Sequence, residues 1–230
     1  MTITADTAAH FEALAARRRS GVPLAYLRGE QEFYGRPFSV GPDVLIPRPD
    51  TETLIEVTLA CLRVRRAPQV LELGTGSGCI AVTLQLERPD TVVTATDISP
   101  KALEVARRNA QQMGANVDFR TGSWFDAIDA SAQFDLIVSN PPYVAAADPH
   151  LADLAHEPSI ALTGGADGLS CLAAIIDGAR PHLSEGGWLV LEHGYDQAKA
   201  VADLMSAAGM EGAEVIRDAA GHKRVTRVRR

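Results

Sequence analysis

From residue 51 to the C-terminus, short apolar runs alternate with longer segments whose apolar positions recur every three or four residues. The short runs have the length and composition of buried strands. They are "QVLEL" (69–73), "TVVTATD" (91–97), "NVDFR" (116–120), "FDLIVS" (134–139) and "GWLVLEH" (187–193). The longer segments have the period of helices and cover residues 51–64, 79–86, 100–113, 169–181 and 196–208. Strands that alternate with helices predict an α/β protein with a doubly wound, mostly parallel sheet.

Two further strands, near "AEVIR" (213–217) and "KRVTRVR" (223–229), close the chain. We expect an antiparallel strand at this C-terminal end of the sheet. The last segment alternates basic and apolar residues, as an exposed strand does, and contact with phosphate or the ribosome is the less favoured interpretation.

The first 50 residues have a different character. Residues 6–20 have the pattern of one short helix, with Asp6 or Thr7 as the cap and Gly21 as the stop. Residues 22–50 are rich in glycine, proline and aromatic residues, and "EFYGRPFSV" (32–40) indicates a hairpin. We therefore divide the chain into an N-terminal segment, 1–50, and a Rossmann-like domain, 51–230.

Composition narrows the class of protein. The 230 residues are 46% hydrophobic and 22% charged, which fits one folded domain with a small appendage. A net charge of −7 argues against a protein that coats nucleic acid or anionic membrane by bulk electrostatics. The three cysteines are few and scattered through core-like segments, which predicts reduced thiols. The chain has no signal-peptide pattern and no apolar run near the ~20 residues that span a bilayer, so we expect a cytoplasmic protein.

Three unusual features follow predicted parallel strands. They are "GTGSG" after the first strand of the domain, Asp97 at the end of the second and Asn140 after the fourth. In doubly wound sheets, ligands bind beyond the carboxyl ends of the strands, where the strand order reverses. The pattern therefore predicts one shared site.

The glycine turn indicates which ligand occupies part of that site. Gly74, Gly76 and Gly78 let the backbone approach a ligand closely at a helix N-terminus, but Cys79 stands where a dinucleotide fingerprint has its third glycine. Asp97, about twenty residues on, is placed to accept hydrogen bonds from two ribose hydroxyls. A ribose without a pyrophosphate indicates S-adenosylmethionine, with its methionine part along the turn.

Simpler interpretations of these residues remain open. The glycines could form a tight turn beside a solvated Asp97. Trp124, in "TGSWFD", could flank the adenine or be core packing. The cysteine and histidine residues show no metal spacing, and the chain has no P-loop and no nucleophile elbow, so no metal is expected.

"SNPPY" ends a core strand with an amide side chain on a backbone stiffened by two prolines. The side-chain oxygen of Asn140 and the carbonyl of Pro141 are two acceptors that can hold both hydrogens of a planar NH2 group. Gripping those hydrogens favours the pyramidal geometry of the transition state over the flat ground state. Pro142 stiffens the loop and Tyr143 can pack against the flat group. The alternative is a kinked turn that merely closes the strand.

Together, "LELGTGSGCIA", "ATDIS" and "SNPPYV" resemble the class I methyltransferases that modify planar nitrogens. "LIPRPDTETLIE" (45–56), "HEPSIALTGGADGL" (156–169), "LEHG" (191–194) and "DAAGHKRVTRV" (218–228) narrow the resemblance to the HemK/PrmC family of glutamine methyltransferases that act on peptide-chain release factors. The likeness covers roughly residues 20–230. NPPY alone is shared with DNA adenine and ribosomal RNA guanine methyltransferases.

The resemblance implies roles for individual residues. It implies transfer of a methyl group from S-adenosylmethionine, which leaves S-adenosylhomocysteine, to the side-chain nitrogen of a glutamine in a release factor. It places Asn140, Pro141, Pro142, Tyr143 and Arg48 at the substrate, with "LIPRP" over the reaction centre. The cofactor residues that it implies are Gly74, Thr75, Gly76, Ser77, Gly78, Asp97, Trp124 and Asn140.

One departure from the family concerns the N-terminus. Family members carry several helices that grip the release factor, whereas about twenty residues precede "GVPLAYLRGEQEF" here. Residues 1–50 are thus expected to be a remnant of that domain, and the chain a trimmed orthologue or a paralogue with another protein target. We expect a monomer.

Two alternatives to a protein-glutamine methyltransferase stay open. One is an N6-adenine or N2-guanine nucleic-acid methyltransferase, disfavoured by the acidic charge and the lack of a recognition domain. The other is a non-catalytic module, which need not keep Asn140 and Tyr143. Near the site, His156 and Glu157 could belong to a lid or be solvated, and Glu192 could support the site or face solvent.

Overall fold

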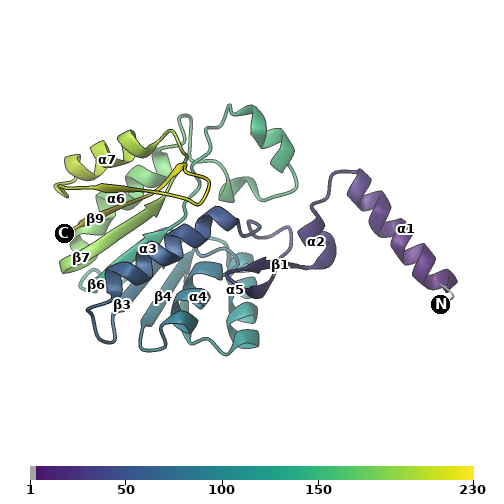
Figure 1. Ribbon diagram of the computed structural model, residues 1–230, viewed down its shortest axis with the longest axis horizontal. Coiled ribbons are helices and arrows are strands. Elements are labelled where there is room, and N and C mark those ends of the chain that lie inside the picture. The colour runs from purple at the N-terminus through teal and green to yellow at the C-terminus, as the bar shows by residue number, and fades with distance from the viewer. Residues whose placement is uncertain (1–3) are drawn as a thin grey trace.

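The computed structural model describes residues 4–230 and contains a seven-stranded sheet covered by helices on both faces (Figure 1). The strand order is β5-β4-β3-β6-β7-β9-β8. The bounds are β3 Gln69–Leu73, β4 Val92–Asp97, β5 Val117–Thr121, β6 Phe134–Ser139, β7 Leu183–Glu192, β8 Glu214–Arg217 and β9 Lys223–Arg229. The strands from β5 to β7 are parallel, and β9 is antiparallel to both β7 and β8. The predicted fold class is confirmed.

The helices form two layers that sandwich the sheet. One layer contains α3, α4 and α5, and the other contains α6 and α7 (Figure 1). Their bounds are α3 Glu52–Leu62, α4 Cys79–Glu87, α5 Pro100–Met113, α6 Ser170–His182 and α7 Ala198–Ala207. The chain runs from β3 outward to β5 and then returns to the other side of β3 with β6. This reversal between β3 and β6 creates the predicted crevice at the carboxyl ends of the strands.

Apolar residues in register across the central strands hold the sheet against α6 and α7. Leu71 on β3 pairs with Ile137 on β6, which pairs with Leu189 on β7. All three are fully buried in one cluster with residues of both helices. Complete burial of such side chains contributes about 1.5–3 kcal/mol each, so this row fixes the alignment of the strand ends that carry the site.

The N-terminal segment contains two helices and a hairpin. They are α1 Ala5–Arg19, α2 Leu24–Arg28, β1 Glu30–Phe33 and β2 Arg36–Ser39. Figure 1 shows α1 extending away from the body of the molecule. The hairpin is the predicted one, and its Phe33 and Phe38 are buried in the same cluster as residues of α3 and α4. The short helix α2 was not predicted.

Two details of the sequence interpretation are wrong. The cap of α1 is Thr4, whose hydroxyl accepts a hydrogen bond from the backbone N–H of Thr7, so neither Asp6 nor Thr7 is the cap. The segment Lys223–Arg229 is not an exposed strand, because only its two end residues are exposed and residues 224–228 are buried or half-buried. It pairs with β7 on one side and β8 on the other. Its three arginines up to residue 229 have partners: Arg227, for example, pairs with Glu214 and lies over the ring of Trp188.

Short 3₁₀ helices complete the chain on the site side: η1 Pro49–Thr51, η2 Pro149–Leu154 and η3 Ser159–Ala161. Within residues 4–230, no helix is long and apolar enough to cross a membrane. The same residues contain no group of three or more metal-ligating side chains.

Candidate active site at the carboxyl edge of the sheet

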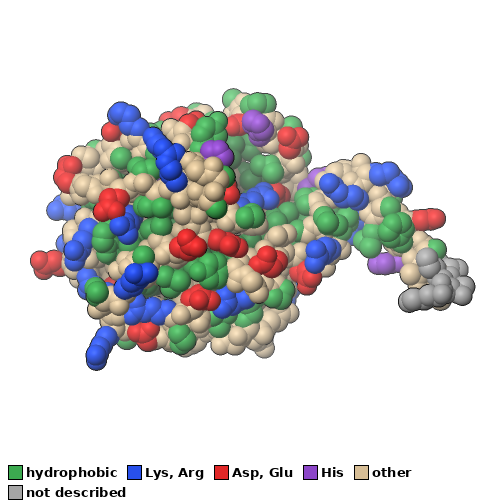
Figure 2. Space-filling view, in the orientation of Figure 1, with side chains coloured by type: hydrophobic (Ala, Val, Ile, Leu, Met, Phe, Trp, Pro, Cys, Tyr) green, Lys and Arg blue, Asp and Glu red, His purple; other side chains and the backbone are tan. Residues whose placement is uncertain are grey.

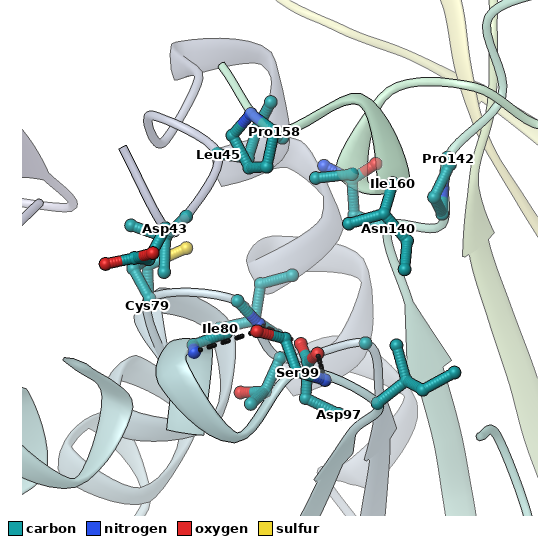
Figure 3. A pocket seen from close by; sticks show the side chains of 18 of the residues that line it. Asp43, Leu45, Cys79, Ile80, Asp97, Ser99, Asn140, Pro142, Pro158 and Ile160 are labelled. Atoms are coloured by element: carbon teal, nitrogen blue, oxygen red, sulfur yellow. Dashed lines mark hydrogen bonds between the residues drawn. The ribbon is translucent and has the colours of Figure 1, made fainter. Parts of the chain in front are cut away.

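A cavity of about 330 Å³ opens at the carboxyl ends of β3, β4 and β6. It is lined by the glycine turn after β3, by Asp97 after β4, by Trp124 after β5 and by Asn140 after β6. Residues before α3 and residues of η3 cover it from outside. Figure 3 shows Asp97 and Ser99 on one side, Asn140, Pro142 and Ile160 on another, and Leu45 beside Pro158. The structure thus brings the three predicted strand ends to one site.

The glycine turn needs its glycines for two different reasons. Gly74, Gly76 and Gly78 all have positive φ, at 74°, 55° and 80°, where L side chains are strained. A Cβ on Gly78 would also lie 3.0 Å from the Cβ of Ala106, so this glycine lets α4 pack closely on α5. A Cβ on Gly76 would meet nothing within 4 Å, because the backbone there faces the open cavity. Thr75 and Ser77 also line the cavity, whereas Gly78 does not.

The Asp97 carboxylate is anchored by backbone donors. Its Oδ2 accepts a hydrogen bond from the N–H of Gly76 at 2.8 Å, and its Oδ1 accepts one from the N–H of Ser99, also at 2.8 Å. Burial raises the pKa of this carboxyl above its usual range, and the backbone hydrogen bonds work in the opposite direction. Each oxygen keeps a further acceptor position, so the anchored carboxylate can bind hydroxyl groups in the cavity.

A buried carboxyl that the sequence interpretation missed supports the turn from below. Glu72, on β3, is fully buried; its Oε2 accepts hydrogen bonds from the Thr75 hydroxyl at 2.6 Å and the Ala81 N–H at 3.0 Å. Its Oε1 has no partner among the described residues. Burial raises the pKa of Glu72 to about 7. A lone glutamate inside the apolar run of a parallel strand was the signal for this residue.

Trp124 combines an unusual backbone with a position against the glycine turn. Its φ is +46°, a region that non-glycine residues rarely adopt. Its carbonyl accepts a hydrogen bond from the Thr96 hydroxyl, and its ring atom Cζ3 lies 3.4 Å from the position of a Cβ on Gly74. The ring both lines the cavity and packs on the α6 side of the sheet. Core packing and a flat cavity wall are therefore not alternatives for this residue.

The Asn140 side chain is held at one end. Its Nδ2 donates a hydrogen bond to Thr51 Oγ1 at 3.2 Å, and its Oδ1 makes no hydrogen bond to another described residue. Pro141 is buried and Pro142 lines the cavity. Tyr143 does not line it: its hydroxyl donates to Glu192 Oε1 at 3.3 Å, on the β7 side.

Glycines of the segment 163–169 hold the Asn-Pro-Pro-Tyr loop in place. A Cβ on Gly164 would lie 2.5 Å from the carbonyl oxygen of Pro142, and one on Gly168 would lie 2.3 Å from that of Tyr143. Gln197, before α7, donates to the same Tyr143 carbonyl at 3.0 Å. This contact between backbones explains Gly164 and Gly168 of "TGGADGL", for which the sequence alone gave no reason.

Arg48 and Glu157 join the two segments that cover the cavity. The Arg48 guanidinium donates to Glu157 Oε1 at 2.5 Å, and the backbone N–H of Ile46 donates to Oε2 at 3.0 Å. The Glu157 side chain is only 2% exposed, whereas that of Arg48 is 35% exposed and lines the cavity. Glu157 is therefore not solvated. His156 is exposed, and its Nε2 contacts the carbonyl of Ser20 at 3.2 Å.

Glu192, at the end of β7, is 1% exposed, so the alternative that it faces solvent is wrong. Burial raises the pKa of its carboxyl to about 7, while Thr51 and Arg224 stabilise the charged form. Arg224 in turn forms ion pairs with Asp50 at 3.1 Å and Asp218 at 3.3 Å. A polar cluster thus lies behind the Asn-Pro-Pro-Tyr loop.

Comparison with known proteins adds the family. Residues 50–157 match the family described as Methyltransferase small domain. The chain is 53% identical over 216 residues to the release factor glutamine methyltransferase of Neisseria gonorrhoeae, covering 93% of this chain and 78% of the relative. It is 52% identical to the enzyme of the same name from Bordetella pertussis, covering 93% and 80%. A methyltransferase crystal structure from Pyrococcus furiosus, 21% identical, aligns over 93% of this chain and 98% of that one with a TM-score of 0.66.

Proposed function

The chain belongs to the release factor glutamine methyltransferase family, and on that premise we propose that it methylates the side-chain amide nitrogen of a glutamine in a peptide-chain release factor. The observation that carries the proposal is the open Oδ1 of Asn140, which lies in the same cavity as the glycine turn and Asp97. Asn140 would then bind the substrate amide and Asp97 the ribose of the cofactor in the same cavity.

The cavity fits S-adenosylmethionine as the cofactor. Asp97 would accept hydrogen bonds from the ribose hydroxyls, since both of its oxygens are already fixed by backbone donors. The turn from Gly74 to Gly78 would hold the methionine part, and Trp124 would flank the adenine. When bound, the cofactor would supply an electrophilic methyl group on a sulfonium centre.

The substrate amide would be held by two oxygens. Asn140 Oδ1 and the carbonyl of Pro141 would each accept one hydrogen of the glutamine NH2 group. Such acceptors favour the geometry in which the nitrogen lone pair is free to attack, so they act on the transition state more than on the ground state. No general base is needed before the methyl transfer.

The loop residues would position rather than react. Pro142 stiffens the loop, and Tyr143, whose hydroxyl donates to Glu192, would hold the loop from the β7 side. Arg48, tied to Glu157, would close the covering segments over the substrate. Residues 1–50 would contribute part of the grip on the release factor, and residues 51–230 the methyltransferase domain.

Surface charge agrees with a protein substrate, and we propose that the protein acts in the cytoplasm. Figure 2 shows acidic and basic side chains interspersed on one face of the body, with basic side chains on the projecting helix α1. The net charge of −7 gives no general attraction for nucleic acid. We propose that the protein acts as a monomer.

A side-by-side assay tests the proposal. Purified protein is offered radiolabelled S-adenosylmethionine with release factor, ribosomal RNA or DNA, and transfer to each is counted. A release factor whose glutamine is replaced by alanine is the control. Label on the wild-type release factor alone supports the proposal; label on RNA or DNA but not on release factor would overturn it.

A further inference from the structure

The orientation of the Asn140 amide decides whether the site can work, because only its oxygen end can accept a hydrogen of the substrate amide. A rotation by 180° would present an NH2 group to the NH2 group of the substrate. The contact from Nδ2 to Thr51 Oγ1 at 3.2 Å holds the useful orientation. A hydroxyl, however, can donate as well as accept, so Thr51 alone would accept either end of the amide.

The direction of hydrogen bonding is set if the Thr51 proton is used elsewhere. Thr51 is 2% exposed, so water does not readily take that proton. Glu192 lies near Thr51, since the Thr51 hydroxyl lowers the pKa of the Glu192 carboxyl. This carboxyl is 1% exposed, and its Oε2 has no hydrogen-bond partner among the described residues, so it keeps an acceptor position for the Thr51 proton.

We propose that Glu192 and Thr51 are positioning residues that fix the Asn140 amide: the Glu192 carboxylate accepts the Thr51 proton, which leaves the Thr51 oxygen to accept from Asn140 Nδ2. An ionised carboxylate can only accept. The Thr51 hydroxyl must therefore donate to Glu192 and accept from Asn140 Nδ2. This orientation of the amide leaves Oδ1 facing the substrate. The inference rests on the proposed function, because it concerns the residue that would bind the substrate amide.

The same carboxylate also fixes the other side of the loop. Glu192 Oε1 accepts the Tyr143 hydroxyl proton at 3.3 Å. The Asn140 and Tyr143 side chains, at either end of the two prolines, are thus both oriented by one buried acceptor. Chains of hydrogen bonds in such a poorly solvated place strengthen one another.

Protonation of Glu192 should loosen this arrangement. A protonated carboxyl can donate to Thr51, which then can donate to Asn140 and favour the wrong orientation. The charged or titratable groups that face Glu192 are Tyr143, Arg224, Asp50 and Cys79. Burial raises the pKa of Tyr143, which keeps the phenol neutral, and burial raises the pKa of Glu192 to about 7. Activity should then rise with pH through about 7.

Enzyme kinetics with purified full chain and release factor test the proposal first. Thr51→Val and Glu192→Gln should each lower kcat about tenfold, the worth of one misdirected hydrogen bond, with unchanged affinity for S-adenosylmethionine by calorimetry. The double variant should be no worse than either single variant, because both act through Asn140. Thr51→Ser should keep the kcat of wild type, because serine retains the hydroxyl. The rise of kcat with pH should vanish in Glu192→Gln.

Thr58→Val is the matched control. Thr58 lies on α3, the helix that begins directly after Thr51; it is fully buried and has a hydroxyl without a partner among the described residues. Its substitution should leave kcat and the pH profile unchanged. Additive losses in the double variant, or a pH profile that survives Glu192→Gln and disappears in Glu72→Gln, would overturn the proposal.

A measurement without substrate separates this inference from the proposed function. In ¹⁵N–¹H spectra, the side-chain amide signal of Asn140, assigned by its loss in Asn140→Ala, should shift with pH with a midpoint near 7. The shift should be absent in Glu192→Gln and Thr51→Val. If wild-type protein shows the shift but modifies no release factor, the proposed function fails and the positioning stands. If it modifies release factor while the amide signal ignores Glu192, the positioning fails and the function stands.

Discussion

Glu72 makes the stability of the protein depend on pH in an unusual direction. Its folded-state pKa is about 7 against an ordinary 4.5, because the carboxyl is fully buried. Between these values the folded protein keeps a proton that the unfolded chain releases, so the free energy of unfolding falls as pH rises from about 4.5 to about 7. A difference of about 2.5 pKa units at ~1.36 kcal/mol each amounts to roughly 3 kcal/mol.

Glu72→Gln isolates this effect. The amide oxygen can accept the hydrogen bonds from Thr75 and Ala81 that Oε2 accepts now, and the amide does not ionise. The free energy of unfolding is measured by urea titration at pH 5 and pH 8 for both proteins. The two proteins share all their other titrating groups. The free energy of unfolding of the variant, relative to that of wild type, should therefore rise by roughly 2.5 kcal/mol from pH 5 to pH 8, because at pH 5 the unfolded chain has already released most of the proton.

The comparison has an internal control and a clear refutation. Glu104→Gln, on the exposed face of α5, replaces a solvated carboxyl and should produce no such shift. If the difference in unfolding free energy between Glu72→Gln and wild type is the same at pH 5 and pH 8, or favours wild type at pH 8, the ionised carboxylate is well accommodated under the glycine turn.

Three further predictions concern the cavity and its surroundings. Asp97→Ala should weaken S-adenosylmethionine by roughly 1.5–3 kcal/mol, the worth of hydrogen bonds to a charged group; equal calorimetric affinities would refute the ribose assignment. Gly168→Ala would place a methyl group 2.3 Å from a backbone carbonyl of the active-site loop, and it should lower the melting temperature more than Gly29→Ala, where φ is similar but nothing lies within 4 Å. Arg48→Met should speed proteolysis of the loop that carries Glu157, because it leaves a buried carboxylate without its cation and with only the Ile46 N–H as a donor; cleavage at the wild-type rate would show that the ion pair does not hold the cover closed.

The sequence predicted most of the sheet because its signals are local. Each parallel strand is a compact apolar run with a helix after it, and strand ends meet at one edge whatever the details of packing. Asn140 and Asp97 could therefore be placed in one site from their positions alone.

The supporting residues were harder to predict because burial depends on contacts between distant segments. Glu192 and Glu72 each stand alone in an apolar strand, a signal that was available, but whether such a carboxyl is buried is decided by the helices packed over it. The Arg48–Glu157 pair joins residues 109 positions apart. The glycines of 163–169 have a reason only once the loop after β6 lies against them. The positive φ of Trp124 has no sequence signature.

The most direct test of the account is a single-turnover comparison of wild type and Asn140→Ala, with saturating S-adenosylmethionine and release factor. Methylated glutamine is quantified by mass spectrometry of the digested factor. The variant should bind the cofactor as wild type does and transfer the methyl group at least ~10²-fold more slowly, because the lost acceptor acts on the transition state. Transfer at the wild-type rate by a variant without this amide would contradict the account.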